Sequence, residues 1–238
     1  MKIVCLTYTY PGDAAKAALC GAFLPPEWTR IWCVEPTHAD MPVPEGVEKL
    51  VADFPRGGSL RYAPALNGMA KVFADFAGKC DALVKLDSDT VLWRPGAWTA
   101  PIEHSGTDFV YIRRHYVEGR LFANGNAYAL SRRALTRMGN FKAEIHAAKN
   151  RYGGHEDRVF SAFLTTENVD LVFCQLDKMR CHWRSAPYVS ADCLCSHYGY
   201  ITFGQMQKKA AEMCEMLGLE MPDVSAYLDK LGAWEAER

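Results

Sequence analysis

Two aspartates one residue apart, Asp87 and Asp89, directly follow the short and mostly apolar run 82–86. Such a run predicts a buried strand of a mostly parallel sheet, and open α/β sheets bind ligands at the carboxyl ends of their strands. Two neighbouring carboxylates repel each other, and a divalent cation with oxygen ligands, such as Mg²⁺ or Mn²⁺, relieves that repulsion. The pattern therefore predicts a metal site at this turn, with a solvated acidic turn as the alternative.

Two later stretches carry groups that could act together with this turn. Glu156 and Asp157 stand where the apolar spacing of 159–164 predicts the first turn of a helix. The helix dipole tends to keep carboxylates there ionised, which suits a base, although the same acids could merely complement the helix N-terminus. The second stretch offers the imidazole of His197 in a late loop.

The composition is that of a soluble globular protein. The chain has 238 residues, of which 49% are hydrophobic and 23% charged, and its formal net charge is -1. No basic face is evident from this balance, so we expect no nucleic-acid partner. No apolar run reaches membrane-spanning length and the N-terminal stretch is too short for a signal peptide, so we expect a cytoplasmic protein without a membrane span.

The cysteines are expected to be reduced and buried. There are nine of them, an odd number, and most lie in apolar contexts rather than in a disulfide framework. One late stretch contains thiols and imidazoles that could hold zinc: Cys174, Cys181, His182, Cys193, Cys195 and His197. Their spacings match no C-x-x-C pair, so buried thiols are the favoured interpretation.

The elements that would position these groups follow a β/α order over residues 1–90 and a mixed order afterwards. Strands are expected at 2–9, 30–34, 47–52, 82–86, 108–112, 122–130 and 169–174. Helices are expected after Asp13 and after Ser131, each as N-cap, between Gly57 and Phe76, over 159–164, and in two amphipathic C-terminal segments around 203–217 and 224–234. Residues 93–96 are expected to form a turn. We therefore predict one α/β domain over 1–238.

Three motifs, at 85–90, 125–131 and 155–157, resemble in order and spacing those of nucleotide-sugar-dependent glycosyltransferases of the GT-A fold. They are most similar to the inverting β-1,3-galactosyltransferase and Fringe-like group, and the resemblance runs from the first strand to about His197. It implies a Rossmann-like mixed central sheet flanked by helices. It also implies a metal-dependent hexosyltransferase, galactosyltransferase being the narrower reading, that moves a sugar from a UDP-sugar to an acceptor hydroxyl with inversion.

The resemblance assigns a role to each motif and a function to each part of the chain. Asp89 would be a direct ligand of Mn²⁺ or Mg²⁺, Asp87 would contact the ribose or the metal, and His197 would complete the metal site. Asp157 would be the general base, with Glu156 as the fallback. The remaining predicted nucleotide-sugar-binding residues are Thr7, Tyr8, Tyr10, Arg61, Asn67, Ser88, Asn124, Gly125, Asn126 and His155. Residues 1–90 would bind the nucleotide, 91–200 the donor sugar and a carbohydrate or glycoconjugate acceptor, and 201–238 would form the C-terminal helices.

Two other classes of function fit part of the pattern. Residues 87–91 also match the D-x-D-x-[TV] motif of haloacid-dehalogenase-like phosphatases, in which the first aspartate is the nucleophile. That motif is expected near the start of its domain, whereas three predicted strands precede it here, so this alternative is the weaker one. A non-catalytic binder of nucleotide-sugars or carbohydrates would need Asp89 but not Asp157.

Overall fold

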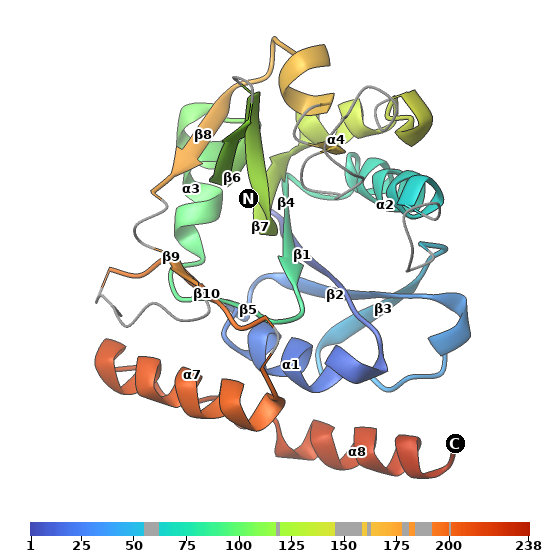
Figure 1. The fold of residues 1–238 in the computed structure, drawn as a ribbon, viewed down its shortest axis with the longest axis vertical. Helices are drawn as coiled ribbons and strands as arrows, with labels where there is room; N and C mark the ends of the chain where they lie inside the picture. The colour runs from blue at the N-terminus through green and yellow to red at the C-terminus, as the bar shows by residue number, and fades with distance from the viewer. Residues whose placement is uncertain are drawn as a thin grey trace.

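A central β-sheet with helices on both faces forms the framework of the molecule (Figure 1). The computed structural model describes residues 1–54, 62–117, 120–145, 159–160, 163–177, 181–183, 192–199 and 201–238. Its strands are β1 (Ile3–Tyr8), β2 (Thr29–Val34), β3 (Val47–Val51), β4 (Ala82–Asp87), β5 (Thr90–Leu92), β6 (Phe109–Val117), β7 (Arg120–Ser131), β8 (Phe173–Leu176), β9 (Cys181–Trp183) and β10 (Cys195–His197). Its helices are α1 (Pro11–Ala22), η1 (Pro36–His38), α2 (Tyr62–Phe76), α3 (Gly96–Ser105), α4 (Arg132–Met138), η2 (Phe163–Glu167), α7 (Phe203–Leu217) and α8 (Ser225–Ala236).

The described residues form a seven-stranded sheet in the order β3-β2-β1-β4-β7-β6-β8. Strands β1 to β4 pair in parallel, β7 runs antiparallel to both β4 and β6, and β6 pairs in parallel with β8. The register sets Tyr8 of β1 beside Asp87 of β4, so the carboxyl ends of these two strands meet at one edge of the sheet. This is the mixed α/β architecture that the sequence predicts, and that edge is where such sheets bind ligands.

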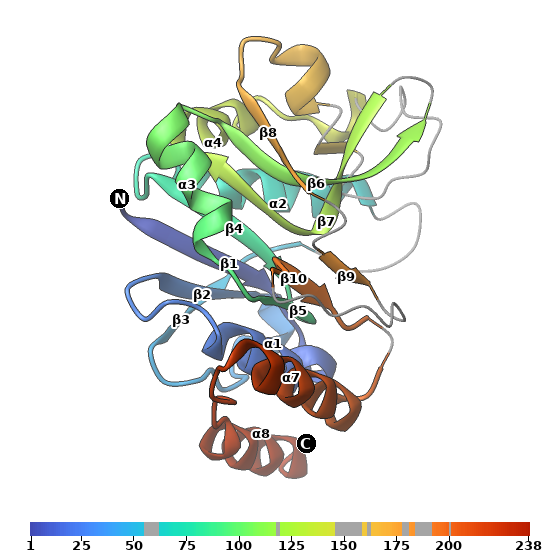
Figure 2. The same ribbon diagram turned by 90° about the vertical axis from the view of Figure 1, so that its left-hand side faces the viewer.

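The helices cover the two faces of the sheet unequally (Figure 2). Helices α2 and α4 cover one face and share a core with the side chains of Leu83 and Tyr128. On the other face, α1, α3 and α7 pack over Val84 and Leu86, and α8 packs against α1. Burial on both faces explains why β4 is an almost continuous apolar run. In the part of the chain that the structure describes, no helix is long and apolar enough to cross a membrane.

Several elements differ from those expected. Helix α1 begins at Pro11, so Asp13 lies in its first turn rather than at the N-cap; proline suits the first helical position because its missing N–H has no helical partner to lose. Strand β8 begins at Phe173, and Val169, where a strand was expected to begin, is 80% exposed. Helix α3 and the small sheet β5-β10-β9 were not expected. Pro101 interrupts the helical pattern of α3, and three-residue strands are too short to show a period.

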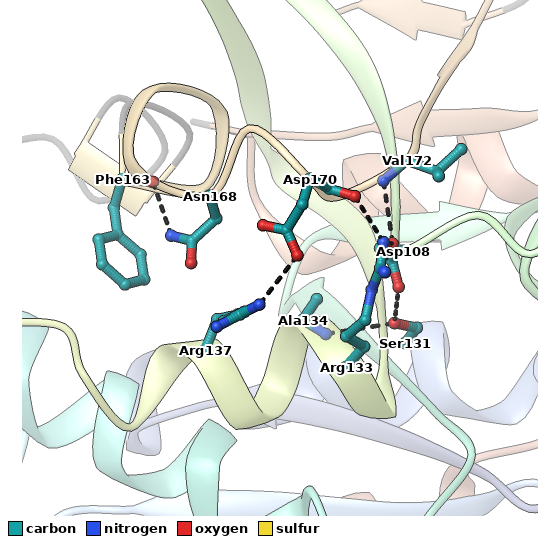
Figure 3. Close-up of polar contacts among 9 residues, drawn as sticks. All are labelled: Asp108, Ser131, Arg133, Ala134, Arg137, Phe163, Asn168, Asp170 and Val172. Atoms are coloured by element: carbon teal, nitrogen blue, oxygen red, sulfur yellow. Dashed lines mark hydrogen bonds and ion pairs between the residues drawn. The ribbon is translucent and has the colours of Figure 1, made fainter.

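The buried carboxylate of Asp108 ties together three elements at the sheet edge opposite the acidic turn (Figure 3). It accepts hydrogen bonds from the hydroxyl of Ser131 at 2.7 Å, the backbone N–H of Val172 at 2.9 Å and Nε of Arg133 at 3.0 Å. The Ser131 hydroxyl in turn accepts from the backbone N–H of Ala134 at 3.2 Å, which confirms the predicted N-cap of α4. Asp108 therefore joins the start of β6 to α4 and to the segment that enters β8.

Candidate active site

Main-chain pairing brings two distant segments together at the carboxyl end of β4. Asp87 is the last residue of β4, and β5 begins three residues later at Thr90. Strand β10 runs antiparallel to β5 with His197 opposite Thr90, and the backbone N–H of Tyr198 donates to the carbonyl of Asp89 at 2.8 Å. The small sheet therefore fixes His197 beside the acidic turn.

Asp89 and His197 form the polar centre of this edge. The Asp89 Oδ1 and His197 Nδ1 atoms are 3.1 Å apart, and the Thr90 hydroxyl lies 3.3 Å from the same ring nitrogen. Burial opposes ionisation of Asp89, but the hydrogen bond and charge of His197, together with the charge of Lys16, outweigh it and hold the pKa of Asp89 below its usual range. Asp89 is thus a carboxylate at neutral pH in a half-buried setting.

This donor set fits a divalent cation. Carboxylate oxygens suit Mg²⁺ and Mn²⁺, and imidazole is a ligand for many transition metals. Asp89 and His197 supply one donor of each kind, while one oxygen of Asp87 is already paired with Lys85. Among the described residues there is no group of three or more His, Cys, Asp or Glu that could hold a metal ion. A site with few protein ligands is still suitable, because Mg²⁺, for example, is commonly bound by only one or two carboxylates together with substrate phosphates.

Helix α1 also supports the acidic turn. The Cys20 thiol donates to the backbone carbonyl of Ser88, with the sulfur 3.3 Å from the oxygen. Complete burial and the nearby charge of Asp89 raise the pKa of Cys20 well above its usual range, so the group stays a thiol and can donate. Ser88 itself is buried, and its side chain was predicted to contact the nucleotide. The sequence signals the burial of Cys20 but not its contact with Ser88.

Three predicted nucleotide-binding residues at or just after the end of β1, Thr7, Tyr8 and Tyr10, differ in their burial. Tyr8, predicted to contact the nucleobase, is 7% exposed and packs edge-on against Phe54 and Phe73, with its hydroxyl 3.4 Å from the carbonyl of Met69. Tyr8 thus belongs to the core, because alternation along β1 turns its ring toward α2, and its contact with the nucleobase stays a prediction. Thr7 is also buried, whereas Tyr10 is half-buried in the N-cap position of α1.

Asn67 likewise makes contacts within the fold, and its contact with the nucleotide stays a prediction. Its side-chain amide donates to the Glu144 carboxylate at 2.8 Å, and its carbonyl oxygen accepts from the backbone N–H of Ala143 at 2.8 Å. Both ends of the amide therefore hold α2 to the segment that follows α4. Arg61, predicted with it, lies outside the described residues.

Strand β7 brings Asn126 to the same edge as the acidic turn. Ala127 pairs with Leu86, so Asn126, one residue earlier, lies beside the end of β4, where it is half-buried. The backbones of Asn124 and Gly125 belong to β7, but their side-chain environment is outside the described set. The predicted acidic group of His155, Glu156 and Asp157 also lies outside the described residues.

The lack of a side chain at Gly199 leaves space for the His197 ring, so replacing Gly199 tests the proposed role of His197 as a metal ligand. A Cβ at this position would lie 2.5 Å from His197 Nε2 and 3.0 Å from its Cε1. Gly199→Ala should therefore displace the imidazole and weaken Mn²⁺ binding by about tenfold, the size expected when a metal ligand is misplaced. Isothermal titration with Mn²⁺ measures this effect, and Gly204→Ala is the control because a Cβ there meets nothing within 4 Å. A folded Gly199→Ala variant with wild-type Mn²⁺ affinity would remove His197 from the ligand set.

The sheet order, with β7 alone antiparallel among its described strands, and the acidic turn after β4 define the GT-A fold of glycosyltransferases. No protein-family model and no curated protein sequence matches the chain. Among solved structures, the galactosyltransferase LgtC in complex with donor and acceptor sugar analogs aligns with a TM-score of 0.54 at 11% identity, over 89% of this chain and 96% of that one. A glycosyltransferase involved in the glycosylation of the major capsid of PBCV-1 aligns with a TM-score of 0.52 at 11% identity, over 89% and 100%. At this identity the similarity establishes the fold alone.

Proposed function

We propose that this protein is a metal-dependent glycosyltransferase that moves a sugar from a UDP-sugar to an acceptor hydroxyl. The adjacency of Asp89 and His197 at the carboxyl end of β4 in a GT-A fold is the observation that carries this proposal. A UDP-sugar brings a diphosphate whose charge grows as the sugar leaves. A site that can hold a divalent cation beside a sheet edge is suited to bind that leaving group.

In this proposal each described residue of the edge has a distinct task. Asp89 and His197 hold Mn²⁺ or Mg²⁺, which when bound offsets negative charge on the departing diphosphate. Asp87, still 35% exposed at its side chain, accepts a hydrogen bond from a ribose hydroxyl. Asn126 lies on the neighbouring strand and contacts the donor sugar. Residues 1–90 then bind the nucleotide, and residues 91–200 bind the sugar and the carbohydrate or glycoconjugate acceptor.

The finer parts of the proposal concern the sugar, the stereochemistry and the location. We infer a hexose donor, with galactose as the first candidate because LgtC is a galactosyltransferase of the same fold. Placement in the β-1,3-galactosyltransferase and Fringe-like group rests on the resemblance of the motifs at 85–90, 125–131 and 155–157. Inversion rests on the same resemblance, with Asp157 as the residue that would deprotonate the acceptor. A cytoplasmic location is proposed from the composition of the chain.

A screen of UDP-sugars tests the proposal directly. We expect one UDP-sugar to raise the melting temperature and to be slowly hydrolysed, and both effects should require Mn²⁺ or Mg²⁺. A non-catalytic binder would show the thermal shift without hydrolysis or transfer. Stabilisation by no UDP-sugar at any cation concentration would contradict the proposed function.

Asp157→Asn tests the proposed general base. Sugar transfer should fall by at least about 100-fold, because a positioned base typically contributes that much or more. The affinity for UDP in the presence of Mn²⁺ should stay close to that of the wild type, since Asp157 acts on the acceptor. Glu156→Gln is the matched control, and proton NMR of the product anomer reports inversion. Unchanged transfer by Asp157→Asn would assign the base elsewhere.

The haloacid-dehalogenase-like alternative is not favoured. Its motif is expected after the first strand of the domain, whereas the acidic turn follows β4, at the centre of a seven-stranded sheet. Both solved structures described above that share this fold are glycosyltransferases. Phosphatase activity on a generic phosphoester that disappears in Asp87→Asn would reverse this order of preference.

A further inference from the structure

Lys85 is a buried cation in the strand that leads to the acidic turn. Its side chain is 2% exposed, in a strand otherwise filled by Leu83, Val84 and Leu86. The Nζ atom lies 5.6 Å from the centre of the Tyr128 ring, within reach of a cation–π contact. Burying an ammonium group is costly unless it is paired, so an apolar side chain would serve packing at this position better.

The ionic partner of Lys85 is the first aspartate of the turn. Lys85 Nζ is 2.5 Å from Asp87 Oδ1, and the two residues lie on the same face of β4 because they are two apart in a strand. The lysine is enclosed by the core, whereas the Asp87 side chain is 35% exposed at the edge of the sheet. The buried end of the pair therefore fixes the direction of the exposed end.

The two aspartates of the turn consequently have different partners. Asp87 is paired with Lys85 on the side of α2, and Asp89 is paired with the imidazole of His197 in the small sheet. A cation drawn to the turn meets one carboxylate held by a buried ammonium, which repels the cation, and one held by an imidazole, which can itself be a metal ligand. The pairing thus favours Asp89 over Asp87 as the metal ligand.

Building on the proposed function, we propose that Lys85 is a positioning residue that keeps Asp87 out of the metal's coordination shell and holds it as the acceptor for a hydroxyl of the nucleotide. Lys85 also reduces the net charge of the turn, Asp87, Asp89 and Lys85 together, from two negative charges to one. The diphosphate of UDP is itself anionic, so this reduction lowers the repulsion that UDP meets on binding.

Replacing Lys85 by methionine, which is similar in length and uncharged, should affect the affinity for Mn²⁺ and the affinity for UDP in different ways. Lys85→Met should bind Mn²⁺ alone at least as tightly as the wild type, because an uncompensated carboxylate then faces the cation. Its affinity for UDP at saturating Mn²⁺ should fall by about tenfold, the scale of one charge-assisted hydrogen bond. Loss of packing alone would weaken both affinities together. Isothermal titration measures each affinity.

A double-mutant cycle with Asp87→Asn shows whether Lys85 acts through its partner. Asp87→Asn leaves the buried Lys85 ammonium without its carboxylate partner and should lower the melting temperature by on the order of 5 °C or more. The double variant Lys85→Met/Asp87→Asn should recover most of that loss. The double variant should bind UDP at least as tightly as the single variant that has the lower UDP affinity. The control is the exposed Arg132–Asp81 pair at the other end of β4, where Arg132→Met and Asp81→Asn should change neither quantity appreciably.

Each outcome decides the inference. The opposite responses of Mn²⁺ and UDP affinity, with non-additive double-variant effects, support it. Wild-type UDP affinity in a folded Lys85→Met variant overturns the positioning role while leaving the proposed function intact. Additive effects on UDP affinity overturn the assignment of Asp87 as the partner. Absence of UDP binding by the wild type overturns the proposed function and, with it, the role of Lys85.

Discussion

Replacing Asp89 by asparagine should weaken UDP binding in the presence of Mn²⁺ by more than about 100-fold, beyond the 10- to 100-fold effect typical of residues that only support a metal ligand. Asparagine keeps the size of the side chain and can still bond to His197 Nδ1, which lies 3.1 Å from Asp89 Oδ1. What it removes is the negative charge that its surroundings hold in place, since the pKa of Asp89 is lowered by His197 and Lys16 against the effect of burial. Isothermal titration with UDP and Mn²⁺ measures the loss.

The matched control for Asp89→Asn is the same substitution at Asp81. Asp81 adjoins the other end of β4, where it pairs with Arg132 at 2.7 Å and is half exposed, so Asp81→Asn removes an equal charge without touching the turn. The melting temperature of each variant shows whether the fold is retained. Metal-independent UDP binding at wild-type affinity in Asp89→Asn would contradict the assignment of Asp89 as a ligand, and loss of affinity in both variants would indicate a long-range charge effect instead.

The sequence was sufficient to predict the architecture and the position of the acidic turn. Strand β4 is apolar at nearly every position because both of its faces are buried, and the apolar run ends at Asp87, which lies at the edge of the core. The β/α order of residues 1–90 and the Ser131 cap were equally readable, since each depends on local pattern alone. Local patterns therefore located the sheet edge, but not which side chains meet there.

Local sequence patterns could not show the partners of the two aspartates, because these depend on pairing across the fold; only the family resemblance placed His197 with Asp89. His197 reaches Asp89 through β10 and β5, strands of three residues that have no detectable period. Lys85 is visible as a basic residue inside an apolar run, and that conflict with burial was the available signal for a paired ion. The sequence alone could not say that its partner is Asp87 rather than solvent.

The contacts that Tyr8 and Asn67 make within the fold were not predicted, for a physical reason that the sequence partly contains. Val4, Leu6 and Tyr8 share one face of β1 by alternation, so the residue next to the ligand edge can still point into the core. Asn67 sits on a helix face that resembles a solvated surface until the segment after α4 packs against it. Side-chain direction follows from strand parity, but contacts between elements distant in the chain do not.

Removing the Asp108 carboxylate should be costly for stability (Figure 3). Its side chain is 6% exposed and accepts hydrogen bonds from Ser131, Val172 and Arg133. We expect Asp108→Asn to lower the free energy of unfolding by about 3 kcal/mol near neutral pH, at the lower end of the range for a broken buried ion pair, because Arg133 is half exposed and can be hydrated. Urea unfolding measures the change. The exposed Arg137–Asp170 pair in the same view is the control, and Arg137→Met should cost less than about 1 kcal/mol.

The pH dependence distinguishes a charge effect from a packing effect at Asp108. Burial opposes its ionisation, but the hydrogen bonds from Arg133, Val172 and Ser131 hold the pKa of Asp108 below its usual range. A carboxyl whose folded pKa is depressed stabilises the fold above its unfolded value of about 3.9, and this stabilisation is lost as the pH falls from there through the folded value. The stability difference between wild type and Asp108→Asn should therefore be full near neutral pH and shrink below about pH 4. A difference that stays constant as the pH is lowered would show that packing at this position, rather than the carboxylate charge, joins β6, α4 and the segment before β8.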